Sequence, residues 1–393
     1  MHQYNIFAVI PRAGTLTSST KSYVWQNNLY RPLVKMGHHV TLLDFDYDDF
    51  FTHAKSNQWL DGHRPNFSEA LKKAFALAHA ARPIDLCFCY LCDGFVAPEV
   101  LAGIRAAGVP VLNYSCNNIH QFNLVEQISR TVDCNVYAEA GAADKFEALG
   151  IPAVQMQMAA DPDFYRAPVG DKHYDVSFVG QRYADRGHLL AALIHAGIDA
   201  HAFGPRWLAT GEVVGNTSLA DRWDKFSSMV RSNGLRYAID FMMSKIGRRW
   251  KDRREDRMLA GQTHGILEDA EMVGIFASSS INLGFATVYQ DAKAGGKEMY
   301  HLRLRDFEVP MAGGFYLTRY TEELEQYFVI GREIECYRNE RELVEKCQYY
   351  LAHPEQRELI RRAGQRRSLA DHTWERRFTQ LFANPSVSRL LST

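Results

Sequence analysis

The order of apolar runs along the chain constrains the fold more than any other feature. Runs of strand length, beginning with YNIFAVI at residues 4–10, alternate with segments whose apolar residues recur at helical spacing. The first unit continues through a Pro/Gly/Ser/Thr loop and a helical stretch to the strand HHVTLLDFD. Because strands that alternate with helices pair in parallel, this order predicts a doubly wound α/β domain with its ligand-facing loops at the carboxyl ends of the strands.

The pattern starts again after the polar, proline-containing stretch DPDFYRAPVGDKH at residues 161–173. Strand YDVSFVG, loop QRYADRG, helix HLLAALIHAG and strand IDAHAFG follow in that order. A chain of 393 residues is long enough for two domains. We therefore expect an N-terminal Rossmann-like domain over residues 1–170, a C-terminal one over residues 171–367 with an insertion at 205–262, and a last helical segment over residues 368–393.

Charge and composition exclude several classes of protein. The formal net charge is −1, which argues against a dedicated nucleic-acid binder, because such proteins need a basic excess to replace phosphate counterions. The sequence has neither an apolar run of membrane-spanning length nor a signal peptide, and its seven cysteines lack disulfide-framework spacing, so we expect a cytoplasmic protein. A basic amphipathic segment at residues 236–257 allows peripheral contact with an anionic membrane surface, although a solvated helix in an insertion is the commoner explanation.

Two patterns invite a metal interpretation, and neither supports one. Cys87 and Cys89 alternate along an apolar strand, where cysteine behaves as a small hydrophobe, and no second ligand pair follows Cys92 at zinc spacing. The letters of a DxD metal motif occur at residues 44–46 and 161–163, but a structural role suits both places better. We expect no metal site.

The stretch RDFEVPMAGG at residues 305–314 places an acidic residue beside a glycine turn. Leu304, Phe307 and Met311 share one face at helical spacing, and Glu308 lies at the edge of that face. Two glycines then end the helix and permit close approach of the backbone to a ligand. This arrangement suits a ribose diol and its phosphates, although from this segment alone an Arg–Glu pair on an ordinary helix end is the simpler explanation.

The C-terminal part of the chain resembles a known family. The segments HLRLRDFEVPMAGGFYLTRYTEELEQYF, IGREIECYRNERELVEKCQYYLAHPEQRELIRRAGQRR and DHTWERRF are similar to the spore maturation protein type of glycosyltransferase, among the group 1-type enzymes. The likeness is dense over residues 298–380 and weaker but collinear before them. It implies the GT-B fold, in which two Rossmann-like domains face each other across a cleft. It also implies a last helix that crosses back to the first domain, with an apolar face formed by Trp374, Phe378, Leu381 and Phe382.

The resemblance also implies roles for individual residues of the second domain. Glu308 would hold the ribose of a nucleoside-diphosphate sugar, and the amides of Gly313 and Gly314 would face its phosphates. Arg182 and Arg186, in FVGQRYADRG, match positions where relatives carry cations on the diphosphate, with two solvated loop arginines as the alternative. Arg305 is a further candidate for the diphosphate.

The acceptor and any general base are expected from the first domain. Asp93, in LCDGF, and His120, in NNIHQF, both follow apolar strands and so lie at ligand-facing ends. His120 has a suitable unperturbed pKa, although a lone His beside Asn and Gln more often orders a loop. Relatives carry an earlier Glu that contacts the sugar, and Tyr300 and His301 stand at those positions here.

The sequence thus predicts a metal-independent glycosyltransferase with a nucleotide-sugar donor and an unidentified acceptor. Two other functions use the same residues. One is a non-catalytic two-domain sensor of a nucleotide-sugar or sugar, and the other is a nucleotide-sugar isomerase or hydrolase on the same fold. Turnover on a panel of donors, with and without acceptors, discriminates among the three.

Overall fold

A computed structural model describes residues 2–12, 14, 15, 21–54, 56–166, 171–208, 255–289 and 298–392. The basic segment at 236–257 and the expected insertion at 205–262 lie largely outside the described residues. The expected domain boundary near residue 170 also falls outside them. Below, residues up to 166 are called the first domain and residues 171–371 the second domain.

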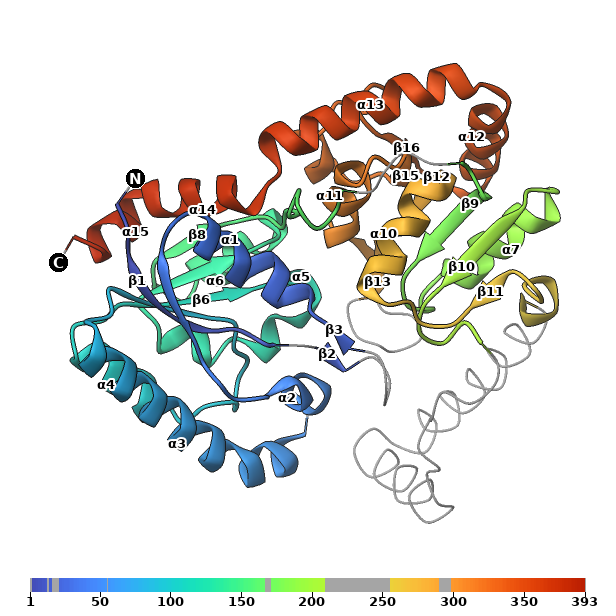
Figure 1. Ribbon diagram of the computed structural model, residues 1–393. Helices are drawn as coiled ribbons and strands as arrows, with labels where there is room; N and C mark the ends of the chain where they lie inside the picture. The colour runs from blue at the N-terminus through green and yellow to red at the C-terminus, as the bar shows by residue number, and fades with distance from the viewer. Residues whose placement is uncertain are drawn as a thin grey trace, which may run out of the picture.

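The first domain is built on a six-stranded parallel sheet (Figure 1). Residues on the central strand β1 (Asn5–Val9) pair with strands on both sides, as Ile6 does with Val40 and Leu86. The strands lie in the order β4 (His39–Leu42), β1, β5 (Leu86–Cys89), β6 (Val111–Ser115), β7 (Cys134–Tyr137) and β8 (Ala153–Gln155).

Helices cover both faces of this sheet because alternate residues of its strands are apolar on both sides. Phe7 and Val9 pack with residues of α3 (Asn57–Ala81) and α4 (Pro98–Ala106) on one face. Ile6 and Ala8 belong to the cluster on the other face, which includes residues of the π-helical turn η1 (Gln26–Tyr30) and of α1 (Arg31–Lys35). Short helices α2 (Asp48–His53), α5 (Asn118–Gln121) and α6 (Ala143–Glu147) complete the connections between strands.

The second domain repeats this design. Its six parallel strands lie in the order β11 (Thr263–His264), β10 (Ala200–Phe203), β9 (Tyr174–Val179), β12 (Ser279–Gly284), β15 (Tyr316–Arg319) and β16 (Glu335–Tyr337). The helices that accompany this sheet are α7 (Arg186–His195), α10 (Asp269–Ser278), α11 (Leu304–Met311), α12 (Glu340–Ala352) and α13 (Pro354–Asp371). The antiparallel pair β13 (Thr287–Tyr289) and β14 (Glu298–Tyr300) lies just before α11 in the chain.

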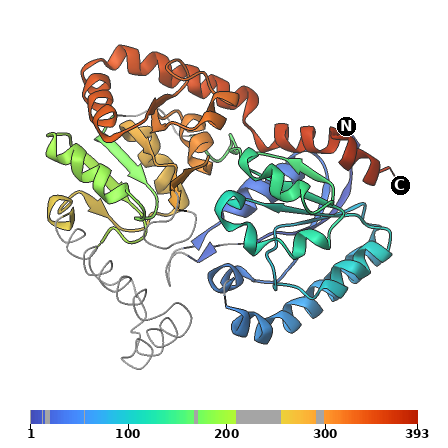
Figure 2. The same cartoon turned by 180° about the vertical axis from the view of Figure 1, so that it is seen from behind.

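The end of the chain crosses from the second domain to the first, as predicted (Figure 2). Helix α14 (Trp374–Ala383) packs on α1, and α15 (Pro385–Leu390) follows it. The Trp374 side chain is fully buried, and its indole Nε1–H donates a hydrogen bond of 2.9 Å to Oδ1 of Asn28. The ring centroids of Phe378 and Phe88, on strand β5, are 5.5 Å apart. The core of the first domain therefore includes residues from the C-terminal end of the sequence.

Within the described part of the chain, no helix combines the length and the apolar character needed to cross a membrane.

Candidate functional site

A cavity of about 1700 Å³ lies between the two domains. Loops at the carboxyl ends of β6, β9, β10 and β12 contribute to its walls, as expected for ligand sites of parallel α/β sheets. The first-domain wall consists of Ser22, Val24, Trp25, Cys116, Asn117, His120, Gln121, Met158 and Tyr165. The second-domain wall carries five arginines: Arg182, Arg186, Arg206, Arg303 and Arg305.

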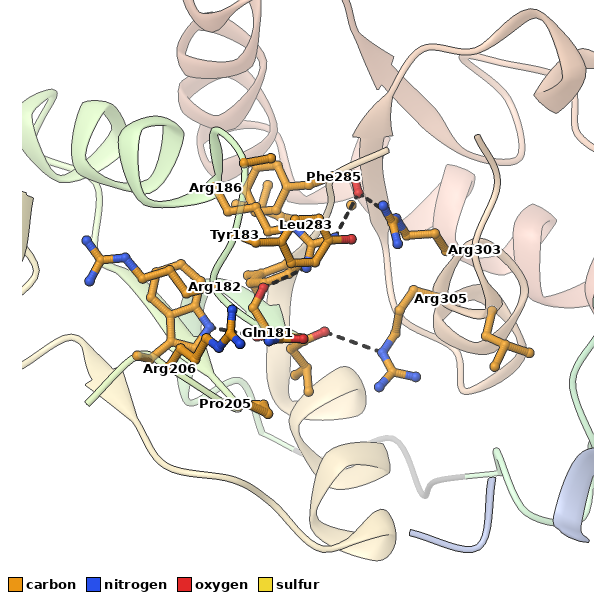
Figure 3. A pocket seen from close by; sticks show the side chains of 18 of the residues that line it. Gln181, Arg182, Tyr183, Arg186, Pro205, Arg206, Leu283, Phe285, Arg303 and Arg305 are labelled. Atoms are coloured by element: carbon orange, nitrogen blue, oxygen red, sulfur yellow. Dashed lines mark hydrogen bonds between the residues drawn. The ribbon is translucent and has the colours of Figure 1, made fainter. Parts of the chain in front are cut away.

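Arg186 is the most deeply buried of these arginines, at 4% exposure (Figure 3). Its guanidinium donates hydrogen bonds of 2.7 Å to the carbonyl of Gln181 and to the hydroxyl of Tyr183. Its Cζ lies 3.7 Å from the centroid of the Tyr183 ring. Burial lowers the pKa of Arg186 to about 10, so the side chain is still a cation at neutral pH. Among the described residues it forms no ion pair, and its Nε has no hydrogen-bond partner.

Arg303, the residue just before α11, also lies close to Tyr183. Its Nε donates to the carbonyl of Phe285 at 3.0 Å, and its Cζ lies 5.4 Å from the Tyr183 ring centroid (Figure 3). Helices α7 and α11 both begin at the cavity, and the free N–H groups at a helix start attract anions. The second-domain wall is therefore suited to bind an anion.

Arg182 also lines the cavity, as predicted, but two carboxylates already engage it. Its guanidinium donates to Asp256 at 2.5 Å and to Glu255 at 3.3 Å. The two arginines predicted to bind the diphosphate therefore differ in their surroundings. Among the described residues, Arg182 has carboxylate partners and Arg186 has none.

The structure places Glu308 behind the wall of the cavity. Its side chain is fully buried and does not line the cavity. One carboxylate oxygen accepts a hydrogen bond from the hydroxyl of Tyr165, and the other pairs with the guanidinium of Arg305. Arg305 itself lines the cavity and donates to the carbonyl of Val179 at 3.4 Å. In this arrangement Glu308 anchors Arg305 at the cavity wall, and its contact with a ribose stays a prediction.

The structure also places Gly313 and Gly314 away from the cavity. Neither glycine lines the cavity, and both amides already donate within the turn, to the carbonyls of Pro310 and Val309. Gly313 has a φ of +78°, and its carbonyl accepts a hydrogen bond of 3.0 Å from Arg361 in α13. The glycine turn therefore allows close packing of α13 on the end of α11.

The two candidate bases of the first domain have different positions. His120 lines the cavity, and its ring centroid is 5.2 Å from that of His301 in the second domain. His301 is buried, its Nδ1 lies 3.5 Å from Oε1 of Glu139, and burial lowers its pKa. Asp93 lies after strand β5, as predicted. Its carboxylate does not line the cavity and accepts hydrogen bonds from the amides of Gln127 and Ile128, which orders the following loop.

Sequence reasoning missed several wall residues. Trp207 follows the strand IDAHAFG, so the rule that found Arg182 would also have found it. Arg303 stands two residues before Arg305, at the predicted helix start. No local sequence pattern predicts that Asp269 lines the cavity. It accepts hydrogen bonds of 2.9 Å from the Ser22 hydroxyl and from the Tyr23 amide, and so joins the domains at the cavity.

The described residues contain no group of three His, Cys, Asp or Glu side chains arranged to hold a metal ion. Cys87 and Cys89 are fully buried in β5, with Sγ atoms 3.5 Å apart, which agrees with their interpretation as small apolar residues.

Comparisons with known proteins now add to this geometry. A family of glycosyl transferase-like proteins matches residues 230–383. A comparison with curated proteins finds no match.

Solved structures are similar over the whole chain. Anabaena HepE in complex with UDP and glucose has a TM-score of 0.56 at 12% identity, with 100% of both chains covered. AviGT4, a glycosyltransferase involved in avilamycin A biosynthesis, has a TM-score of 0.54 at 14% identity, with 99% of this chain and 98% of that chain covered. Sucrose-phosphate synthase from Thermosynechococcus elongatus has a TM-score of 0.55 at 11% identity, over 97% of this chain and 100% of that chain. These likenesses show that the fold is GT-B.

Proposed function

We propose that this chain is a glycosyltransferase that takes its sugar from a nucleoside-diphosphate sugar. The observation that carries the proposal is Arg186, a buried cation at the wall of an interdomain cavity without a carboxylate partner among the described residues. An unpaired buried charge is strongly unfavourable, so such a group indicates a site completed by an anionic ligand. A diphosphate supplies two charged groups, which suits Arg186 and the neighbouring Arg303.

The matches support the same donor class. Residues 230–383 match glycosyl transferase-like proteins, and a solved structure of the same fold was determined with UDP and glucose. The finer likeness to the spore maturation type rests on the sequence segments alone and is part of this proposal.

The geometry suggests how the reaction is promoted. As the bond between the sugar and the diphosphate breaks, negative charge grows on the leaving phosphate oxygens. Arg186, Arg303 and the start of α7 are already oriented at the cavity wall, so they stabilise this charge without rearrangement. His120, on the opposite wall, is the candidate that orients or deprotonates the acceptor hydroxyl. In this proposal the arginines take the role of a metal ion.

The chain as it stands can be assayed directly. Purified protein is incubated with UDP-, GDP-, ADP- and dTDP-sugars, with and without a panel of acceptors, and release of the nucleoside diphosphate is measured. The proposal requires acceptor-dependent release. Nucleotide binding without turnover would indicate a sensor, and acceptor-independent conversion of the donor would indicate an isomerase or hydrolase.

Ligand binding is measured separately by thermal shift. A nucleotide at one hundred times its dissociation constant should stabilise the fold by about 2.7 kcal/mol. Arg186→Ala should remove most of this shift. Arg341→Ala is a matched control, because its side chain is 85% exposed on α12 and lies outside the cavity.

A further inference from the structure

The two walls of the cavity differ in charge. Among the described residues, the second-domain wall carries all the charged side chains, five arginines and four carboxylates. The described part of the first-domain wall carries no lysine, arginine or carboxylate, and its polar side chains are those of Ser22, Asn117, His120, Gln121 and Tyr165. If the diphosphate lies on the charged wall, the acceptor faces the uncharged one.

An aromatic residue lies on this uncharged wall. Trp25 is half-buried at the start of η1, and its ring packs at 4.6 Å from the ring centroid of Tyr90. The carbon-bound hydrogens of a sugar ring are weakly positive, so they pack favourably on the negative face of an indole ring.

Hydrogen-bonding side chains stand on a rigid loop on the same wall. The carboxylate of Glu139 is buried beneath this loop and accepts from the amides of Asn117, at 2.5 Å, and Asn118, at 3.0 Å. Lys145 donates to the carbonyl of Ile119 at 2.6 Å. Asn117 has a φ of +64°, a left-handed conformation that is unusual outside glycine and is common at functional sites.

The side chains that this loop presents to the cavity are neutral. Asn117, His120 and Gln121 line the cavity, and the side-chain amide of Gln121 makes no hydrogen bond to a described residue, whereas its backbone N–H donates to the carbonyl of Asn117 at 2.8 Å. Amide groups both donate and accept, so they match hydroxyl groups better than charged groups. An anionic acceptor would lack a lysine or arginine on this wall. A cationic acceptor would meet a carboxylate only at its edge, where Asp269 already accepts from Ser22 and Tyr23, and would face the arginines opposite.

We propose that the first-domain wall binds an uncharged saccharide as acceptor, with one sugar ring on Trp25 and its hydroxyl groups bonded to Asn117, His120 and Gln121. The inference rests on the proposed function, because it assigns the acceptor of that same site. It excludes acidic acceptors and amine acceptors as the group that contacts this wall.

Saccharide binding to the full chain tests this proposal without turnover. Neutral trisaccharides of glucose, galactose, mannose and N-acetylglucosamine are compared with an anionic trigalacturonate and a cationic glucosamine trimer. Binding is followed by saturation-transfer NMR, with and without saturating UDP. At least one neutral probe should bind, and tighter than both charged probes.

Substitutions on the first-domain wall test whether the neutral probe binds there. Trp25→Ala should weaken binding of the neutral probe by about tenfold, equivalent to about 1.4 kcal/mol, and Gln121→Ala by several-fold. Tyr349→Ala is the matched aromatic control, since Tyr349 is 47% exposed and lies outside the cavity. Trp25→Phe, which keeps an aromatic face, covers the case in which Trp25→Ala does not fold. UDP affinity should be unchanged in all these variants.

The proposal is overturned if no neutral probe binds, if a charged probe binds tighter, or if Trp25→Ala leaves neutral-probe binding unchanged. Failure of UDP to bind the wild-type chain would instead count against the donor site, because the saccharide measurement is also made without nucleotide.

Discussion

The hydroxyl of Tyr165 donates a hydrogen bond to the carboxylate of Glu308, across the boundary between the two domains. The other carboxylate oxygen pairs with Arg305, which lines the cavity. A residue at the end of the first domain thus helps to fix a cation on the wall of the second domain. Since both Tyr165 and Glu308 are almost fully buried, this contact is shielded from water.

Tyr165→Phe removes only the hydroxyl of this contact. Because the lost hydrogen bond has a charged acceptor, we expect the free energy of unfolding to fall by about 1.5–3 kcal/mol, measured by urea denaturation. Tyr349→Phe, on an exposed side chain, should have no effect. An unchanged stability for Tyr165→Phe would show that the contact does not join the domains in solution.

Glu308→Gln distinguishes an anchor from a direct ribose ligand. As an anchor, Glu308 stabilises Arg305, so the variant should lose stability by at least as much as Tyr165→Phe. Nucleotide affinity should then fall no further than it does in Arg305→Ala. Calorimetry that finds weaker nucleotide binding at unchanged stability would restore the ribose role.

The two arginines of the β9–α7 loop should differ in their effect on catalysis. Arg186→Ala should lower kcat by about 10²–10³-fold, the range for loss of one donor to a developing charge, and raise KM less. Arg182→Ala should have a smaller effect on kcat, because Asp256 and Glu255 already neutralise Arg182. A change confined to KM in Arg186→Ala would place that residue outside the chemical step.

Trp374→Ala leaves a large cavity between α14 and the first domain. Truncation of a buried aromatic side chain commonly destabilises by about 3–5 kcal/mol, and the Oδ1 of Asn28 also loses its donor. We expect a clear fall in Tm while the residues of the interdomain cavity stay in place. Trp374→Phe, which keeps most of the volume, should cost less, and equal Tm values for Trp374→Ala and the wild type would contradict this packing.

Lowering the pH should destabilise the connection between α13 and α14, because His372 lies between these helices and becomes protonated. Its Nε2–H donates to the carbonyl of Tyr327 at 2.8 Å, and burial, with Arg377 and Arg367 nearby, lowers its pKa to about 4. Asp371 opposes this shift. The unfolded chain protonates this histidine near pH 6.5, so the stabilising contribution is present above that pH and is lost as the pH falls toward 4, by up to about 3 kcal/mol.

The measurement compares urea denaturation of the wild type and His372→Gln between pH 7.5 and pH 4. Other buried histidines titrate in both proteins, so only the difference reports on His372. Stability should fall more steeply in the wild type. Parallel curves would mean that His372 is protonated equally easily in the folded and unfolded chain.

Transfer should continue in excess EDTA, because arginine side chains and helix N–H groups are proposed to stabilise the leaving diphosphate. The assay is repeated after dialysis against EDTA and after addition of Mg²⁺ or Mn²⁺. Loss of activity in EDTA that either ion restores would refute this part of the mechanism.

The fold could be predicted because a short stretch of sequence is enough to indicate most of its strands and helices. Most strands of the two sheets appear as short apolar runs, and the restart at YDVSFVG marks the second sheet, whereas the short edge strands β11 and β16 give no such run. The loops with Arg186 and His120 follow from the same rule, since strand ends of one sheet meet at one edge.

The partners of Glu308, Gly313 and Asp93 could not be read from the sequence, and the physical reasons differ. Helix α13 arrives some fifty residues later in the chain and covers the end of α11, as the bond from Arg361 to Gly313 shows. Asp93 does lie after a strand, but backbone amides of the following loop engage its side chain. A sequence window shows which residues follow a strand, but not which partner each side chain finds.

The position of Trp374 in the first domain has a consequence for synthesis of the protein. The ribosome completes the strands of the first sheet long before it makes the helix that covers one face of that sheet. At ~5–20 residues per second, the roughly 200 residues between β8 and α14 take on the order of 10–40 s to appear. Throughout that interval the nascent first domain holds an uncovered apolar surface around Asn28 and Phe88. The first domain therefore cannot complete its core until α14 has been synthesised, although its own strands are made first.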